Sequence, residues 1–564
     1  MASAFGRSGA KTARRCLSVG TSSIAQRRAC AGSCCHAVLK TSPIRPGIFR
    51  HQRHSSTSSS PTAAPNKEIV QLRDGPYDPF NAIVSTLPPS PATENVGSRS
   101  PLAGWTAAVK ANFCVKGAPT SCSSPMLESY ESTFDAAAVT SLRQAGADLR
   151  YVTNCDEFGM GSNNVHSVHG AVRNPASAAQ NPESTGVDWD AEMERSSGGS
   201  SGGSAAAVRA GLVRFALGSD TGGSIRLPAA YCGVVGLKPS YGLVSRWGLV
   251  SYADSLDTVG VLTRTVEDAE QVHGVLVKHD ARDPTSASQE SRSAAAQLVN
   301  DVIAALPTAD SQRPLKGVRV GVPKEYFPVE LHPRVLPAFR RTVDALTELG
   351  AEVVSIQLPS TPSALSAYYI ISSAEASSNL ARYDGVEYGL HVPPVPGHHA
   401  YAATRTAGFG DEVRKRILLG TFALTADAFD NFFLQASRVR ADIQRDFATA
   451  LRIPSPSTVL GQTPQEVQLN AAGVDVILHP SAVDTAPTLA SALNKERDAG
   501  VAEYVQDILT VPASLAGLPA LALPAGVADD GWPVGATLVS QWGCDRLILH
   551  VAKQLQRQLA EQAQ

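Results

Sequence analysis

The chain has 564 residues, of which 43% are hydrophobic and 18% charged. This length allows one large domain or two to three average ones, and the composition is that of a globular protein. The longest apolar runs, such as residues 518–523, are too short to cross a membrane, so the sequence predicts no membrane span. The cysteines outside the N-terminal tail are scattered, which favours reduced thiols in a non-secreted protein without a metal site.

The N-terminal segment differs in kind from the rest. Residues 1–67 hold 11 of the 49 Lys and Arg, no Asp or Glu, and many Ser and Ala. This composition is typical of an organelle transit peptide, and its abundance of Arg favours the mitochondrion (matrix) over the plastid. We predict a transit peptide and linker over 1–60 and one domain over 61–564. A basic arm that binds nucleic acid or membrane is the alternative.

The remaining chain carries a formal charge of about −13, because 38 Lys and Arg oppose 51 Asp and Glu. An acidic body is a poor match for a phosphate backbone. If the protein acts on a nucleic acid, a partner should hold that nucleic acid.

Helical and strand patterns alternate along the body. Short apolar segments predict strands at 107–114, 147–152, 318–322, 353–358, 474–479 and 519–523, and helical spacing predicts helices at 134–145, 333–349 and 547–560, with mostly helix over 360–450. Thr265 begins a capping-box-like helix start. Residues 280–312 are polar and are expected to cross the surface. The pattern predicts an α/β fold with a mixed central β-sheet flanked by helices on both faces.

Two glycine–serine turns stand close together, SSGGSSGGS at 196–204 and GSDTGGSIR at 218–226. Glycine lets the backbone approach a ligand closely. A flexible linker does not fit, because the apolar residues 205–217 lie between the turns. Neither turn matches GxxxxGK[ST] or GxGxxG, so nucleotide binding has little support.

Serine chemistry is the remaining option. Residues 198–202 match GxSxG, but a charged segment precedes them where a nucleophile elbow needs a strand. No histidine stands near either turn. A lysine made neutral by burial is another base for a serine. Lys110, in the apolar segment AAVKANF, is the best-placed candidate, although a single strand lysine is usually a surface residue.

Three segments, AAVKANFCVKG, GGSSGGSAAAV and LGSDTGGSIRLPAAYCGVVGLKPS, together resemble the amidase signature family in order and separation. The resemblance is strong over residues 100–275 and looser towards the C-terminus. It implies that Lys110 is the catalytic lysine, Ser200 the bridging serine held by a cis peptide, and Ser224 the nucleophile. Thr221, Gly222 and Gly223 would join Ser224 in offering backbone N–H groups to an oxyanion.

Further segments, among them RKRILLGTFAL and DILTVPASLAGLPAL, are similar to the glutamine-hydrolysing subunits of glutamyl-tRNA(Gln) amidotransferases. This resemblance implies a glutaminase with a Ser–cisSer–Lys triad and an acyl-enzyme, which supplies ammonia to convert Glu-tRNA(Gln) to Gln-tRNA(Gln) in mitochondrial translation. It implies two partner subunits, B and C, and no cofactor in this chain, with ATP and Mg²⁺ used by a partner that also holds the tRNA. Arg440 would bind the glutamine carboxylate and Asp507 its ammonium group. Tyr383 and Tyr388 are both candidate substrate contacts.

Two alternatives remain open: a free-standing amidase for small or lipid amides, and a scaffold without catalysis. The presence of Lys110, Ser200 and Ser224 together argues against the scaffold. One departure concerns the lysine, because Ala111 stands where the family commonly has Asp. That replacement puts the positioning of Lys110 in question.

Overall fold

The computed structural model describes residues 78–88, 100–176, 194–307, 312–456, 467–497 and 504–562. The chain divides into two units, Met1–Lys67 and Glu68–Gln564, and all the described residues belong to the second. The predicted transit peptide and linker lie outside the described residues, and the predicted boundary at residue 60 stays a prediction. All that follows concerns the second unit.

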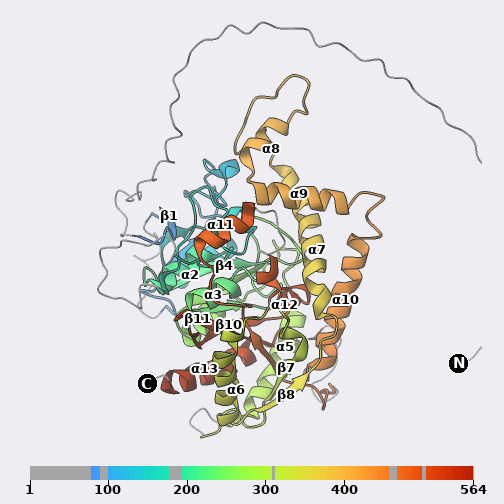
Figure 1. Cartoon of the computed structure of the whole chain (residues 1–564). Helices are drawn as coiled ribbons and strands as arrows, with labels where there is room; N and C mark the ends of the chain where they lie inside the picture. Colours follow the sequence, from blue (N-terminus) through green and yellow to red (C-terminus); the bar gives the residue numbers. More distant parts are fainter. Residues whose placement is uncertain are drawn as a thin grey trace, which may run out of the picture. The chain divides into compact units, whose positions relative to one another are not determined.

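An 11-stranded mixed sheet forms the centre of this unit, in the order β1-β3-β2-β4-β6-β5-β10-β11-β9-β7-β8 (Figure 1). Strand β2 is parallel to both β3 and β4, and β7 is parallel to both β8 and β9, while the other neighbours are antiparallel. The strands are β1 (Ile83–Thr86), β2 (Thr106–Lys110), β3 (Asp148–Thr153), β4 (Phe215–Asp220), β5 (Val235–Lys238), β6 (Thr258–Thr263), β7 (Arg319–Pro323), β8 (Glu352–Ile356), β9 (Val476–Pro480), β10 (Ala520–Val527) and β11 (Pro533–Val539).

Helices cover both faces of the sheet, as predicted. One apolar cluster packs α1, α4, α6 and α13 against strand residues such as Val109 and Leu217, and another packs α2 and α3 against Ala108 and Ala216. Successive strand residues alternate between the two clusters because side chains on a strand point to opposite faces. The helices are α1 (Ala137–Gln144), α2 (Gly202–Arg209), α3 (Arg226–Cys232), α4 (Val266–Leu276), α5 (Gln289–Ala304), α6 (Leu336–Glu348), α7 (Ala364–Asn379), α8 (Ala402–Gly408), α9 (Asp411–Ala423), α10 (Phe433–Ala450), α11 (Leu489–Arg497), α12 (Val511–Leu515) and α13 (Asp545–Gln562).

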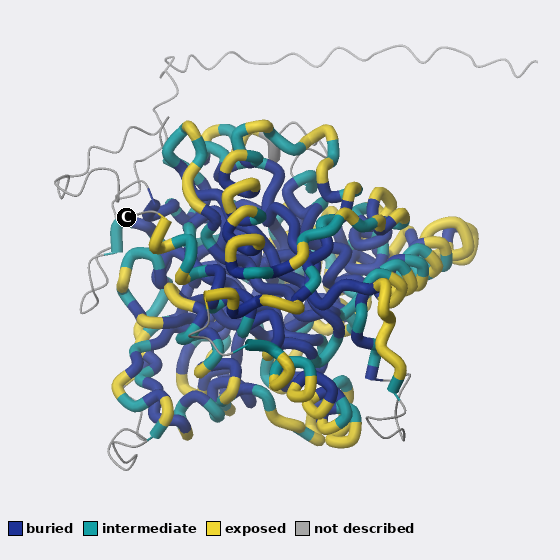
Figure 2. The backbone as a smooth tube through the Cα atoms, turned by 90° about the horizontal axis from the view of Figure 1, so that it is seen from below, coloured by how far each residue is buried: buried dark blue, intermediate teal, exposed yellow. Residues whose placement is uncertain are grey.

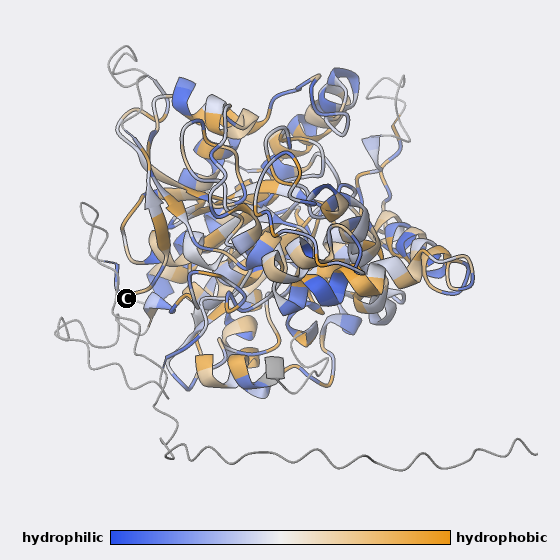
Figure 3. Cartoon of the chain, turned by 90° about the horizontal axis from the view of Figure 1, so that it is seen from above, coloured by the Kyte–Doolittle hydropathy of each residue, from blue (hydrophilic) through white to orange (hydrophobic). Residues whose placement is uncertain are grey.

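A third group of helices, α7, α9, α10 and α12, packs into its own apolar cluster beside the sheet. In Figure 1 α7, α9 and α10 lie at the right of the strands. Figure 2 shows that the centre of the unit is buried and that its outer helices are partly exposed. Hydrophilic and hydrophobic residues are mixed along the helices at the outside of the unit (Figure 3), whereas α7 is buried along most of its length.

Helix α5 was not predicted. The polar segment 280–312, expected to cross the surface, contains α5 over Gln289–Ala304, and most residues of this helix are exposed or half-buried. Ser288 caps this helix by accepting a hydrogen bond from the Ser291 N–H, and Leu298 and Val299 bury one face. Arg292 is mostly buried and donates to the carbonyl groups of Gly242 and Leu243, so a charged residue contributes to the buried side.

Candidate active site

The sheet brings the predicted lysine and both serine turns to one edge. Lys110 is the last residue of β2, and the second turn follows the end of the parallel neighbour β4. The carboxyl ends of parallel strands meet at the same edge, where sites are commonly built. The first turn leads into α2, which packs on β4, and so Ser200 reaches the same place.

Lys110 is completely buried and surrounded by hydroxyl groups. Its Nζ lies within hydrogen-bond distance of the Oγ atoms of Ser200 at 2.7 Å, of Ser201 at 3.0 Å and of Ser219 at 3.0 Å. Burial lowers the pKa of the Lys110 ammonium, and the more distant carboxyls of Asp156 and Asp220 oppose this effect. The site therefore favours a neutral lysine.

Two further hydrogen bonds fix how protons are distributed around this lysine. Asn112 Nδ2 donates to Ser219 Oγ at 2.9 Å, and Ser201 Oγ donates to the Ser219 carbonyl oxygen at 3.2 Å. Because the hydroxyl proton of Ser201 is used in that bond, its oxygen is left to accept from Lys110. The hydroxyl proton of Ser200, in contrast, is not used in a hydrogen bond to a carbonyl group of any residue that the structure describes.

The first turn is held on several sides. The Gly199–Ser200 peptide bond is cis. Gly199 N–H donates to the Ser162 carbonyl at 2.8 Å, and the Ser200 carbonyl accepts from Asp156 N–H at 3.2 Å. A Cβ at position 199 would lie 2.0 Å from the Asp156 carboxylate, so only glycine fits there.

Ser224 lies next to this turn, since its carbonyl accepts from Ser201 N–H at 3.0 Å. The hydroxyl of Ser224 has no hydrogen-bond partner within the described ranges, and 8% of the residue is exposed. The structure thus joins Lys110 directly to Ser200, whereas the link from Ser200 to Ser224 runs through the backbone.

The second turn presents unused donors. Nothing in the described part of the chain accepts a hydrogen bond from the N–H groups of Gly222, Gly223 or Ser224. A Cβ at Gly222 would lie 2.4 Å from the Tyr368 ring, and one at Gly223 2.3 Å from Thr510 Oγ1. Two glycines are therefore required by the close approach of these neighbours.

Thr221 contributes its side chain as well. Its hydroxyl donates to Asp257 Oδ1 at 2.6 Å, and Asp257 Oδ2 accepts from the N–H groups of Tyr252 and Ala253. Burial raises the pKa of Asp257 to about 6. This carboxyl fixes the start of the turn.

A buried ion pair supports the second turn. Arg226 and Asp220 are both fully buried, with Arg226 Nη2 2.9 Å from Asp220 Oδ1. Arg226 also donates to the Thr510 carbonyl at 2.7 Å and to Ser514 Oγ at 2.9 Å. Both charged residues lie within the motif GSDTGGSIR, but the sequence analysis assigned them no role, because it interpreted that motif only through Ser224 and the oxyanion donors Thr221, Gly222 and Gly223.

Asp507 lies close to this turn. It ends a short 3₁₀ turn, Tyr504–Asp507, and its carboxylate accepts from Ser162 Oγ at 2.9 Å and from Tyr369 Oη at 2.7 Å. Thr510 Oγ1 donates to the carbonyls of both Gly222 and Asp507. The predicted ammonium-binding residue and the glycine turn are therefore connected through Thr510.

Arg440, the predicted carboxylate-binding residue, has protein acceptors for all its guanidinium nitrogens. Its Nε donates to the Leu515 carbonyl at 2.9 Å, and Nη1 and Nη2 donate to the hydroxyl and carbonyl of Ser255 at 2.7 and 2.8 Å. These bonds anchor α10 to two neighbouring segments.

Another arginine, Arg416 on α9, contacts a residue that binds Asp507. It is buried, donates to Glu412 at 2.7 Å and to the Tyr252 hydroxyl at 2.7 Å, and stacks 5.0 Å from the Tyr369 ring. Tyr369 in turn binds Asp507. Neither Arg416 nor Tyr369 was singled out, because only the packing of α7 against α9 brings them together.

Tyr383 and Tyr388, the two candidate substrate contacts, pack against each other and, through Tyr383, against Phe158. Tyr368 and Tyr369 are the tyrosines that touch the glycine turn and Asp507.

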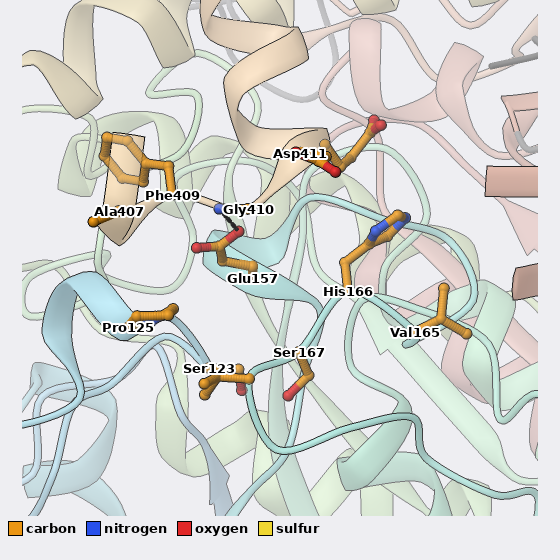
Figure 4. Close-up of a pocket in the computed structure, with 12 residues that line it drawn as sticks. Ser123, Pro125, Glu157, Val165, His166, Ser167, Ala407, Phe409, Gly410 and Asp411 are labelled. Carbon is orange, nitrogen blue, oxygen red and sulfur yellow. Dashed lines mark hydrogen bonds between the residues drawn. The ribbon is translucent and has the colours of Figure 1, made fainter. Parts of the chain in front are cut away.

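A cavity of about 290 Å³ opens between the segment after β3 and the start of α9 (Figure 4). Glu157 at its wall accepts from Ser124 Oγ at 2.5 Å and Gly410 N–H at 2.9 Å, and burial raises its pKa to about 7. Neither Lys110 nor the two serines line this cavity. Glu157 ties α9 to the segment that carries Gly159, whose Cβ would lie 3.6 Å from Ser200 Oγ.

Comparison with known proteins decides the family. The amidase family model matches residues 90–549. The chain belongs to the amidase family. This amidase is 66% identical over 549 residues to the mitochondrial A subunit of glutamyl-tRNA(Gln) amidotransferase from Mycosarcoma maydis, covering 97% of this chain and 98% of that one. It is 43% identical to the A subunit of glutamyl-tRNA(Gln) amidotransferase from Pseudomonas aeruginosa, with 82% and 84% coverage.

Among solved structures, the amidase is similar to the A subunit of glutamyl-tRNA(Gln) amidotransferase from Thermotoga maritima, with a TM-score of 0.62, 33% identity, and coverage of 85% and 87%. A structure described as an amidase matches with a TM-score of 0.61 and 28% identity over 85% and 92% of the two chains. Within the described ranges the amidase has no helix able to span a membrane and no cluster of three potential metal ligands.

Proposed function

We propose that this chain is the A subunit of a mitochondrial glutamyl-tRNA(Gln) amidotransferase and that it acts as the glutaminase of that complex. The observation that carries the proposal is the 66% identity to a relative of that name over 97% of the chain. The contact of 2.7 Å between Lys110 Nζ and Ser200 Oγ supports the chemistry.

Lys110 acts as the base in its neutral form. A neutral amine has two N–H donors and one lone pair. Ser201 Oγ and the doubly contacted Ser219 Oγ take the two N–H groups, which leaves the lone pair facing Ser200 Oγ. Lys110 can then accept a proton from Ser200, and Ser200 from Ser224.

Ser224 Oγ attacks the side-chain amide carbon of glutamine, forming a C–O bond. The N–H groups of Gly222, Gly223 and Ser224 donate to the oxyanion, with the turn fixed through Thr221. The C–N bond breaks, and the proton held by Lys110 returns through Ser200 to the leaving nitrogen, which departs as ammonia. Water then hydrolyses the acyl ester and releases glutamate.

Asp507 is suited to the α-ammonium group of glutamine, because it is held by Ser162 and Tyr369 beside the glycine turn. For the α-carboxylate we assign Arg416 in preference to Arg440. Arg416 contacts Tyr369 and has an Nη2 group for which the described residues provide no acceptor, whereas every nitrogen of Arg440 is used.

Ammonia passes to partner subunits B and C, where ATP and Mg²⁺ activate Glu-tRNA(Gln) for conversion to Gln-tRNA(Gln) in the mitochondrial matrix. A partner that holds the tRNA agrees with the acidic body of this chain. Cofactor chemistry is assigned to the partner, since hydrolysis of an amide by serine needs none. A free-standing amidase for small or lipid amides is the second candidate, and the family membership favours it as well.

The deciding experiment is Ser224→Ala in the assembled complex, assayed with glutamine and separately with ammonium. We expect glutamine-dependent amidation to be lost and ammonium-dependent amidation to remain. Loss of both activities would assign Ser224 a structural role, and loss of neither would remove it as the nucleophile. Faster turnover of aryl or fatty amides than of glutamine by the chain without partners would favour the free-standing amidase.

A further inference from the structure

The corner between α9 and α10 carries a concentration of exposed apolar side chains. Of the seventeen exposed large hydrophobic residues in the described ranges, six lie within 15 positions, whereas no 15 positions elsewhere in those ranges hold more than three. Leu418 is 70% and Phe422 53% exposed. The six residues, called the corner patch below, are Leu418, Leu419, Phe422, Leu424, Phe429 and Phe432.

The corner patch is an ordered surface. The rings of Phe422 and Phe432 meet at 5.5 Å, which joins the end of α9 to the start of α10, and Phe429 meets Phe433 at 5.3 Å. The corner projects at the right in Figure 1 and is exposed in Figure 2. Contiguous apolar surface of this kind marks interaction sites, because leaving it in water is unfavourable.

The charged residues around the corner patch indicate which kind of partner would fit it. Residues 417–437 contain two acidic residues, Asp427 and Asp430, and no Lys or Arg. Both are exposed, and neither forms an ion pair with any residue that the structure describes. A complementary surface would therefore combine apolar side chains with at least one Lys or Arg.

A second copy of this chain is a poor match. In a two-fold contact the same patch lies on both sides, and so the two aspartates of one copy would meet a surface that carries two aspartates and no basic residue. Like charges placed together oppose such an association.

We propose that the corner patch is the docking surface for another subunit of the amidotransferase, one that presents apolar side chains with a basic residue. This inference rests on the proposed function. The position of the patch gives the docking a consequence. The opposite face of α9 carries Arg416 and packs on α7, where a Cβ at Gly420 would lie 1.9 Å from the Ser373 carbonyl oxygen. A partner on the outer face thus holds the helix that positions Arg416.

The test measures binding directly. Leu418→Ser combined with Phe422→Ser, in the full chain, is titrated with purified subunits B and C, with Val329→Ser as the matched control because Val329 is 95% exposed elsewhere. We expect the double variant to bind subunits B and C at least tenfold more weakly than the wild type, and the control to bind them with unchanged affinity. Thermal unfolding of the free chain should be unchanged in both variants. Equal assembly by both variants would overturn the proposal.

Three further readouts separate other outcomes. Asp427→Lys with Asp430→Lys should weaken assembly too, and unchanged affinity would refute the charge argument. Backbone hydrogen exchange of 418–432 should slow only on adding the partners. Slow exchange in the free monomer would mean that another segment of this chain covers the patch, and a dimer that dissociates in the Leu418→Ser variant would mean a self-interface. Binding is measured without glutamine, whereas the proposed function is tested by the activity of Ser224→Ala. Failure of the docking proposal can therefore be distinguished from failure of the proposed function.

Discussion

Ser219 offers the sharpest test of how Lys110 is used. Ser219→Ala removes the oxygen that accepts from Lys110 Nζ at 3.0 Å and from Asn112 Nδ2 at 2.9 Å. Two buried donors lose their partner, and each costs about 1–3 kcal/mol when unsatisfied. More important for catalysis, one N–H of the neutral amine no longer has a fixed direction, and the lone pair can rotate away from Ser200.

If about 1.4–2.8 kcal/mol of this cost falls on the transition state, kcat/KM for glutamine decreases by about 10- to 100-fold. The assay is glutamate release by the assembled complex, with ammonium-dependent amidation as the internal control for folding and assembly. Ser219→Thr keeps the hydroxyl and should restore most of the rate. Glutamine hydrolysis within twofold of the wild type in a stable Ser219→Ala complex would refute the proposed proton arrangement.

Two further predictions concern the base and the buried ion pair. Because only neutral Lys110 accepts a proton and burial lowers its pKa from 10.5, kcat/KM for glutamine should rise with pH to a plateau reached below pH 10.5, while a rate that falls across this rise would contradict the role. Arg226→Met leaves Asp220 buried without its partner and should lower the free energy of unfolding by about 3–5 kcal/mol in a denaturant titration, with recovery in Arg226→Met combined with Asp220→Asn; an unchanged midpoint would exclude the support assigned to the pair.

Much of the fold could be predicted from periodicity alone. The helix capped by Thr265 and the β7–α6–β8 unit lie close to their predicted positions, because each has a strong local signal. Strand β2 begins close to the predicted start at 107 but ends at Lys110 and not at 114, which places the lysine at the edge of the sheet. Thr265 does accept a hydrogen bond from Asp268 N–H as a cap should. Helix α5 was missed because its residues are mostly polar, although Ser288 and the spacing of Ala295, Leu298 and Val299 were visible signals.

The residues of the site also differ in whether a local sequence pattern could predict them. Lys110 and Ser200 come from motifs, and the structure places them in contact. The residues around the substrate come from distant elements, and no local pattern reports that α7 brings Tyr368 against Gly222 or Tyr369 against Asp507. The preference for Arg416 over Arg440 could not come from the sequence, because a charged residue on an amphipathic helix does not reveal whether its nitrogens already have acceptors in the fold.

Ala111 shows how the geometry answers a question that the sequence left open. Lys110 points towards the face of the sheet covered by α2, whereas Ala111 is fully buried in the apolar cluster on the other face, together with Val109. An Asp at position 111 would be directed into that apolar cluster, where an ionised carboxylate is costly. A nearby negative charge would also favour the protonated lysine. Replacing Asp by Ala111 therefore removes no contact of Lys110 in this fold, and it is consistent with Lys110 acting as a base in its neutral form.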